Sequence, residues 1–130
     1  MKQITVVCDD RPGLVADISK ALGDRGVNIE TLDAEGREGY GIVVLTVDKY
    51  DEALRALRDA SLHAVTEDAL VILVKDEPGA LGKIALRFRE ANINLRSVRI
   101  IKRERGHTLI ALAAERSEQA RNLVQDILIS

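Results

Sequence analysis

Aromatic side chains are nearly absent from this sequence. It contains no tryptophan, one phenylalanine and two tyrosines among 130 residues. Proteins hold single-stranded nucleic acids largely by stacking the bases on aromatic side chains. The formal net charge of −2 also gives no basic excess that would attract phosphates. We therefore expect no nucleic-acid partner.

Cysteine and histidine are as scarce as the aromatic residues. Cys8 is the only cysteine, and the two histidines, His63 and His107, stand far apart. A single thiol cannot form an internal disulfide, and a metal site would need several ligands at short spacing. We expect Cys8 to be a small hydrophobic side chain in a strand, and we expect no metal and no cofactor.

Long hydrophobic runs are missing. Apolar runs such as residues 42–45 and 109–114 are far too short to cross a bilayer. Met1 and Lys2 lead directly into a strand-like stretch, with none of the features of a signal peptide. With 46% hydrophobic and 31% charged residues the chain has a globular composition. A cytoplasmic protein without a membrane partner is expected.

Proline occurs only twice, and both times it marks a repeat. Pro12-Gly13 and Pro78-Gly79 are 66 residues apart, and a shift by 66 aligns residues 4–57 with 70–123 without a gap. The identical pairs include Asp10/Asp76, Ile18/Ile84, Asn28/Asn94, Arg37/Arg103, Glu38/Glu104, Glu52/Glu118, Arg55/Arg121 and Leu57/Leu123. The repeat predicts two modules of the same fold, residues 1–67 and 68–130.

Hydrophobic periodicity predicts the order β-α-β-β-α-β in each module. In the first module the strands are residues 4–8, 27–34, 40–47 and 62–66. One helix begins at residue 12, and the other covers residues 51–60. In the second module the strands are 69–75, 93–102 and 107–114, and the helices are 78–91 and 117–126. Only 127–129 remain for the last strand, which is either stunted or absorbed into the helix. The side chains expected to face inward from the first helix of each module are Leu14, Val15, Ile18, Ala21 and Leu22, and Leu81, Ile84, Ala85 and Phe88. The predicted fold class is α+β, with two ferredoxin-like modules whose helices cover one face of the sheet.

The third predicted strand of each module is apolar on both faces. Val43 and Leu45 point one way along the strand, while Ile42 and Val44 point the other way. A sheet face that meets water would be polar. We therefore expect the second face to be covered, with the two modules paired into one sheet and two chains forming a homodimer.

Two features of each module could hold a ligand. Gly13 and Gly79 stand where a helix begins, so that backbone N–H groups there could bind a carboxylate while Asp10 or Asp76 binds an ammonium group nearby. The alternative is that these aspartates only cap the helix. Asn28 and Asn94 open the next strand, where their amides could contact both ends of an amino acid or could simply satisfy the turn.

These two features together resemble the ACT domain. Asp10-Arg11-Pro12-Gly13-Leu14 followed by Gly26-Val27-Asn28-Ile29 is a close match. Asp76-Glu77-Pro78-Gly79-Ala80 followed by Asn92-Ile93-Asn94-Leu95 is a looser one, because Asn92 replaces the glycine. A chain of two such modules is similar to the stand-alone tandem ACT proteins of bacteria and archaea.

The resemblance implies a regulatory protein and not an enzyme. ACT domains typically bind an amino acid at the seam between two modules, which pair side by side into one continuous antiparallel sheet, and the signal would act on a separate enzyme of amino-acid metabolism. The implied ligand-binding residues are Asp10, Arg11, Pro12, Gly13, Leu14 and Asn28 for one site, and Asp76, Glu77, Pro78, Gly79, Ala80 and Asn94 for the other. Because Arg11 is replaced by Glu77 in the second turn, we expect the first turn to bind a carboxylate more tightly.

Two other functions fit the same topology. One is an interaction module of the same fold that binds no ligand. The other is an acylphosphatase-like hydrolase, for which Arg11 and Asn28 would be the catalytic pair. Pro12 argues against the hydrolase, because it removes one N–H donor from the phosphate cradle that this chemistry needs.

Overall fold

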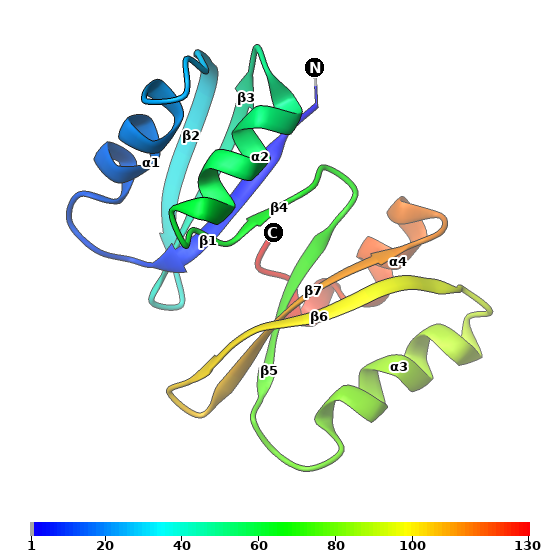
Figure 1. The fold of residues 1–130 in the computed structure, drawn as a ribbon. Coiled ribbons are helices and arrows are strands. Elements are labelled where there is room, and N and C mark those ends of the chain that lie inside the picture. The colour runs from blue at the N-terminus through cyan, green and yellow to red at the C-terminus, as the bar shows by residue number, and fades with distance from the viewer. Residues whose placement is uncertain (1) are drawn as a thin grey trace. The chain divides into compact units, whose positions relative to one another are not determined.

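A computed structural model describes residues 2–130 of the chain. The chain divides into two compact units, Met1–Glu67 and Asp68–Ser130, which we call the first and second modules (Figure 1). Each module has its own sheet, its own helices and its own hydrophobic core. None of the helices among residues 2–130 is both long enough and apolar enough to span a membrane.

The first module has the predicted order of elements. Its antiparallel sheet has the strand order β2-β3-β1-β4. The strands are β1 (Ile4–Asp9), β2 (Ile29–Arg37), β3 (Tyr40–Val47) and β4 (Ala64–Val65), and the helices are α1 (Leu14–Gly23) and α2 (Tyr50–Asp59). Both helices lie on the same face of the sheet (Figure 1).

The second module repeats this arrangement with a shorter end. Its sheet has the order β5-β7-β6. The strands are β5 (Leu70–Lys75), β6 (Leu95–Glu104) and β7 (His107–Ala114), and the helices are α3 (Ala80–Glu90), α4 (Ser117–Leu123) and the 3-10 turn η1 (Gln125–Ile127). In place of a fourth strand, a single bridge joins Ile72 and Leu128, and the Val71 N–H donates to the Ser130 carbonyl at 2.8 Å. Of the two alternatives for residues 127–129, the structure shows a stunted strand at Leu128, while Ile127 belongs to η1.

The ferredoxin-like α+β class is confirmed, but the continuous sheet is not what the hydrogen bonds show. The described strands form two sheets, one in each module. Only four residues separate β4 from β5, whereas β2 and β6 are the opposite edges of their sheets. The connection therefore joins the modules at the strands farthest from the open edges β2 and β6.

The helices bury a narrower stripe than the sequence suggested. Ile18 and Leu22 of α1 are fully buried, and Ile84 and Phe88 of α3 are nearly so. The predicted inward positions Val15, Leu81 and Ala85 are wrong: Val15 is 41% and Leu81 39% exposed, and Ala85 is also exposed. A helix that packs on a single sheet contacts it through residues four apart, so side chains one position further round the helix remain in solvent.

The apolar character of both sheet faces is confirmed. Val43 and Leu45 of β3 belong to the core cluster beneath the helices. Ile42, on the opposite face of β3, is only 2% exposed, and Val7 of β1 is fully buried, although neither belongs to that cluster. Burial on both faces explains why β3 and β7 read as nearly continuous hydrophobic runs.

The repeat contains an insertion that the gapless alignment missed. β1 and β5 begin 66 residues apart, at Ile4 and Leu70, but β3 and β7 begin at Tyr40 and His107, and 107 − 40 = 67. The pairing of β6 with β7 shifts by one residue between Ile100 and Lys102. A β-bulge accommodates one extra residue in this way.

Beyond the bulge, equivalent residues of the two modules are 67 positions apart instead of 66. The buried pairs Ala53/Ala120 and Leu57/Val124 occupy equivalent positions, at a spacing of 67. Identities found at a spacing of 66 beyond this point, such as Glu52/Glu118, are therefore coincidental. The hairpin between β2 and β3 of the first module is also tighter than predicted, because β2 continues to Arg37 and only Glu38 and Gly39, both with positive φ, form the turn.

An ion pair fastens the end of the second module. The Arg87 guanidinium donates to both carboxylate oxygens of Asp126, at 2.7 and 3.0 Å, and to the Leu123 carbonyl at 3.2 Å. The hydrogen bonds from Arg87 lower the pKa of the Asp126 carboxyl below its usual value. The ionised form is thus favoured in the folded state.

We expect Asp126→Asn to lower the free energy of unfolding by no more than about 1 kcal/mol at pH 7, because the pair is largely exposed. The contribution of Asp126 is present above the pKa of the unfolded carboxyl and is lost as the pH falls through the lowered folded pKa. Urea unfolding at pH 7 and at pH 2.5 checks this prediction. A difference between wild type and variant that persists undiminished at the lower pH would contradict it.

Candidate functional site

The turn between β1 and α1 presents an uncapped helix N-terminus. Gly13 is the N-cap residue, with φ 85° and ψ 2°, and no side chain among the described residues caps the helix. The left-handed conformation explains the glycine, since a residue with a Cβ is strained there. The first N–H groups of a helix have no partner within it. The Leu14 N–H donates to the Arg11 carbonyl at 3.4 Å, so the N–H groups of Val15 and Ala16 are the ones available to an anion.

Asp10 does not cap this helix, so the capping alternative is wrong for it. Its N–H donates to the Gly39 carbonyl at 3.1 Å, and its carboxylate lies against Gly36 of β2. A Cβ on Gly36 would stand 2.5 Å from Asp10 Oδ2. The absence of a side chain at Gly36 is what allows Asp10 to approach the sheet this closely.

Gly41 makes room for Leu14 in the same way that Gly36 makes room for Asp10. It is the cross-strand partner of Gly36, and a Cβ at Gly41 would stand 2.5 Å from Leu14 Cδ2. Leu14 is 6% exposed and belongs to the core of the first module. The pair of glycines therefore positions both ends of the turn on the sheet.

A shallow cavity of about 320 Å³ opens between this turn and the hairpin. Its lining residues are Asp10, Arg11, Gly13, Leu14, Val15, Ala16, Ala34, Glu35, Gly36, Gly41 and Val43. Four of the predicted site residues of this module line it, whereas Pro12 and Asn28 do not. Arg11 Nη2 lies 2.7 Å from Asp17 Oδ2, so the positive charge on Arg11 is compensated within the turn.

The second module has a different cavity at the equivalent turn. All five predicted residues from Asp76 to Ala80 line a space of about 210 Å³, together with Arg103 and Thr108. Gly79 has φ 82°, and the Asp76 N–H donates to the Gly106 carbonyl at 2.9 Å, as Asp10 does to Gly39. The backbone of the turn is thus repeated.

The side chains on the sheet below the second turn are not repeated. Arg103 and Thr108 are cross-strand partners in the place of Gly36 and Gly41. Ala80 stands in place of Leu14. The large side chain of Leu14 thus packs over Gly41 in the first module, whereas the small Ala80 lies at the same cavity as Thr108 in the second. Arg103 also places a positive charge where the first cavity has Gly36, which weakens the electrostatic reason for expecting the first turn to bind a carboxylate more tightly.

Asn28 lies at the other end of the module from Asp10. The Asn28 N–H donates to Asp48 Oδ1 at 2.9 Å, just beyond the end of β3, whereas Asp9 pairs with Tyr40 at its start. The eight residues of β3 span about 26 Å at 3.3 Å per residue. Asn28 and Asp10 of one module therefore cannot contact the same amino acid.

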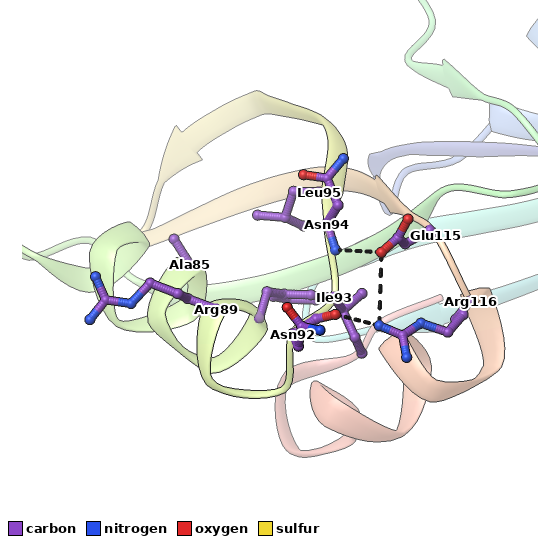
Figure 2. A pocket seen from close by; sticks show the side chains of 9 residues that line it. Ala85, Arg89, Asn92, Ile93, Asn94, Leu95, Glu115 and Arg116 are labelled. Carbon is purple, nitrogen blue, oxygen red and sulfur yellow. Dashed lines mark hydrogen bonds and ion pairs between the residues drawn. The ribbon is translucent and has the colours of Figure 1, made fainter.

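Asn94 lines a cavity of about 640 Å³ at the corresponding end of the second module. The Asn94 N–H donates to Glu115 Oε1 at 3.1 Å, and Arg116 donates to the Asn92 carbonyl. Figure 2 shows that the Asn94 amide is directed away from the Glu115–Arg116 pair. The backbone, and not the amide, holds this turn, so the amide is available for other contacts.

The acid–base pair that holds each asparagine turn was missed in the sequence. Asp48-Lys49 of the first module corresponds to Glu115-Arg116 of the second. In each pair the acid accepts a hydrogen bond from the backbone N–H of the asparagine. The base donates to the carbonyl of the residue two positions before that asparagine. At a spacing of 67 this signal was present in the sequence. The bulge in β6 hid it from an alignment at 66.

The structure also tests the catalytic alternative. An acylphosphatase-like reaction would need Arg11 and Asn28 at one phosphate, but they lie at opposite ends of the module and Arg11 is paired with Asp17. Within residues 2–130, no group of His, Cys, Asp and Glu side chains is arranged to hold a metal ion. The geometry therefore does not bring together the pair of residues that this reaction would need.

A family model matches part of this chain. Residues 2–61 match the family described as "ACT domain". None of the curated proteins compared with the chain matches it.

Several solved structures are similar to this chain. A crystal structure of a protein from Bacteroides thetaiotaomicron is 17% identical, with a TM-score of 0.50, covering 98% of this chain and 90% of that one. The regulatory subunit of aspartate kinase from Thermus thermophilus is 21% identical, with a TM-score of 0.45 and coverage of 97% and 91%. The acetolactate synthase small subunit from Thermotoga maritima is 17% identical, with a TM-score of 0.42 and coverage of 99% and 89%. The first module, which residues 2–61 nearly fill, is thus similar to an ACT domain.

Proposed function

We propose that this chain is a non-catalytic sensor that binds an α-amino acid and regulates a separate enzyme or regulator of amino-acid metabolism in the cytoplasm. One observation carries the proposal. The uncapped N-terminus of α1 and the carboxylate of Asp10 lie at the same cavity, in a module similar to an ACT domain. A carboxylate next to free N–H groups is the arrangement that a zwitterion would complement.

The chemistry of binding follows from these groups. The ligand carboxylate accepts hydrogen bonds from the N–H groups in the first turn of α1. Its ammonium group binds Asp10, with Glu35 of β2 on the same cavity. Charge-assisted hydrogen bonds of this kind are stronger than neutral ones. Arg11 supports the turn through Asp17 and is not needed as a ligand.

Asparagine contacts must come from another module. Asn28 is too far from the turn of its own module, but the Asn28 or Asn94 amide of a module paired beside it could reach the same ligand. The second module has the same order of elements and the same turn geometry as the first. We therefore propose that residues 68–130 form a second ACT domain, with Arg103 and Thr108 giving its cavity a different specificity.

A thermal-shift screen of the full chain with the twenty amino acids tests the proposal. A ligand that binds only the native state, at a concentration one hundred times Kd, adds about 2.7 kcal/mol to the free energy of unfolding. We expect one amino acid, or a few similar ones, to raise the melting temperature. If none of the twenty does so, the alternative of an interaction module without a ligand is favoured.

Matched substitutions then locate the site. Asp10→Ala should weaken binding of the amino acid by about 1–3 kcal/mol, because the bound ammonium group would lose its charged partner. Asp76→Ala is the matched control in the second turn. Calorimetry on both variants tells which turn is occupied. An affinity unchanged in both variants would place the site elsewhere.

A further inference from the structure

The cavity at the turn of the second module opens beside an uncapped helix N-terminus. α3 follows Gly79, whose φ of 82° is left-handed, and no described side chain caps the helix. The Ala80 N–H donates to the Glu77 carbonyl at 3.2 Å. The N–H groups of Leu81 and Gly82 form no backbone hydrogen bond within residues 2–130. An anion in the cavity can therefore accept hydrogen bonds from these two groups.

A buried hydroxyl without a protein partner lines the same cavity. Thr108 of β7 is 5% exposed. It pairs with Val74, a residue of the core beneath α3, so its side chain lies on the helix side of the sheet. Among residues 2–130 the Thr108 hydroxyl has no hydrogen-bond partner. Buried polar groups normally have one, so this hydroxyl is suited to contact a polar ligand in the cavity.

A cation stands directly across from Thr108. Arg103 of β6 is the cross-strand partner of Thr108 and also lines the cavity. Its neighbours Lys102 and Arg105 lie 3.4 and 3.6 Å from Glu104. Arg103 itself forms no ion pair with any residue of the described range 2–130. Because side chains directly opposite on two strands have Cβ atoms about 4.5–5.5 Å apart, one carboxylate can contact both Arg103 and Thr108.

Two acidic side chains of the turn complete the charges of the cavity. Asp76 and Glu77 both line it, and neither carboxylate is paired with a basic residue in the part of the chain that the structure describes. They repel a ligand that carries only negative charge, and they attract an ammonium group. The helix N-terminus, the cation and the two acids together match a ligand with two carboxylates and one ammonium group.

The volume of the cavity restricts the ligand to a small molecule. The cavity measures about 210 Å³, which is below the roughly 300–1,000 Å³ of pockets that hold drug-sized ligands. Leu81 and Ile100 line it and are 39% and 41% exposed. These two side chains offer an apolar surface to the methylene groups of a short ligand.

We propose that the cavity of the second module binds an acidic amino acid, aspartate or glutamate, and that Arg103 and Thr108 select its side-chain carboxylate. The α-carboxylate accepts hydrogen bonds from the N–H groups of Leu81 and Gly82, and the ammonium group binds Asp76. This inference rests on the proposed function and names the class of ligand for one of its two turns.

The guanidinium of Arg103 distinguishes the two acids from their amides. Its parallel N–H donors match both oxygens of a carboxylate. The side-chain amide of asparagine or glutamine has one oxygen and one NH₂ group, which only donates. One side of the amide would therefore place donors against donors. Both amides should bind more weakly than the acids.

The first module lacks the residues for this selection. Two glycines stand at the positions of Arg103 and Thr108. Arg11 is the one basic residue among those that line the first cavity, and it is already paired with Asp17. Glu35 lines the same cavity and would repel a second carboxylate. We therefore expect the two modules to respond to different amino acids.

Calorimetric titration of the full chain with glutamate, aspartate, glutamine, asparagine and succinate tests the inference. Wild type should bind one of the acids about 10-fold more tightly than its amide and than succinate. Arg103→Met should weaken binding of that acid about 10-fold, and should change binding of the amide less than about two-fold. These factors are at the lower end for hydrogen bonds to charged groups, because Arg103 is exposed.

Matched variants separate selection from general effects of charge and fold. Arg99→Met removes the same charge from the same strand, on the sheet face away from the helices, and should leave every affinity unchanged. Arg103→Lys keeps the charge but loses the planar fork, so it should retain only part of the preference for the acid. Thr108→Val should weaken binding of the acid about 3-fold. Circular dichroism should show all variants folded.

Three results would overturn the inference. Acids that bind no more tightly than their amides would show that the cavity does not select a second carboxylate. Equal losses for acid and amide in Arg103→Met would give Arg103 a structural role only. Succinate that binds as tightly as glutamate would show that no ammonium group is recognised. In each of these cases, binding of a neutral amino acid would leave the proposed function standing, whereas no binding of any amino acid would contradict both.

Discussion

Replacing Phe88 by alanine is expected to lower the free energy of unfolding of the second module by about 3–5 kcal/mol. Phe88 is 1% exposed and is the only phenylalanine of the chain, at the centre of the core formed by α3, β5 and β7. Alanine would leave a cavity that the surrounding strands can only partly close. Urea unfolding followed by circular dichroism measures the loss.

The repeat supplies the control for this substitution. Leu22 of α1 occupies the equivalent position in the first module and is fully buried. Phe88→Leu should therefore cost clearly less than Phe88→Ala, because leucine fills most of the volume in a site of the same design. The unfolding transition of the first module should stay unchanged in both variants. Equal losses for alanine and leucine would show that the volume of Phe88 is not what stabilises this core.

The second large effect concerns the contact between Leu14 and Gly41. Leu14→Ala is expected to cost about 2–5 kcal/mol, because Leu14 is buried in the core. Gly41→Thr is expected to cost about 1–3 kcal/mol, because its Cβ would stand 2.5 Å from Leu14 Cδ2 and displace the side chain. Both losses should appear in the unfolding of the first module.

Combining the two substitutions tests whether they share one space. Leu14→Ala/Gly41→Thr reproduces Ala80 and Thr108 of the second module, so its loss should be at least about 1 kcal/mol smaller than the sum of the single losses. A double-mutant cycle in urea measures this coupling. Strict additivity would mean that Leu14 and Gly41 do not compete, and that the different side chains in the two turns evolved independently.

The order of elements could be predicted from the sequence because each signal was local. Apolar runs with glycine or proline at their ends predicted β3 and β7 to the residue. The inward faces of α1 and α3 were predicted too broadly, since one sequence cannot tell whether one layer or two cover a helix. Val15 and Leu81 would have been buried only under a second layer.

The candidate site was harder to predict, because it depends on residues far apart in the sequence. The turn at Gly13 was found, but Gly36 and Gly41, which make room for it, matter only once β2 and β3 are placed beneath the turn. The sequence alone did not show that Asn28 lies far from that turn, because the distance between them follows from the length of β3. The bulge in β6 leaves no composition signal, since Ile100, Ile101 and Lys102 all suit a strand.

Separate sheets also set the order in which this chain can fold during synthesis. Every strand of the first sheet lies between Ile4 and Val65, so its core is complete before any strand of the second has emerged from the ribosome. At about 5–20 residues per second, the 65 residues from Thr66 to Ser130 take roughly 3–13 s to follow. Until β6 has followed, the edge strand β2, with Glu30, Asp33 and Glu35 against the single base Arg37, is present without its counterpart in the second module. Nascent first modules on neighbouring ribosomes would therefore repel one another at β2, which protects them from premature association.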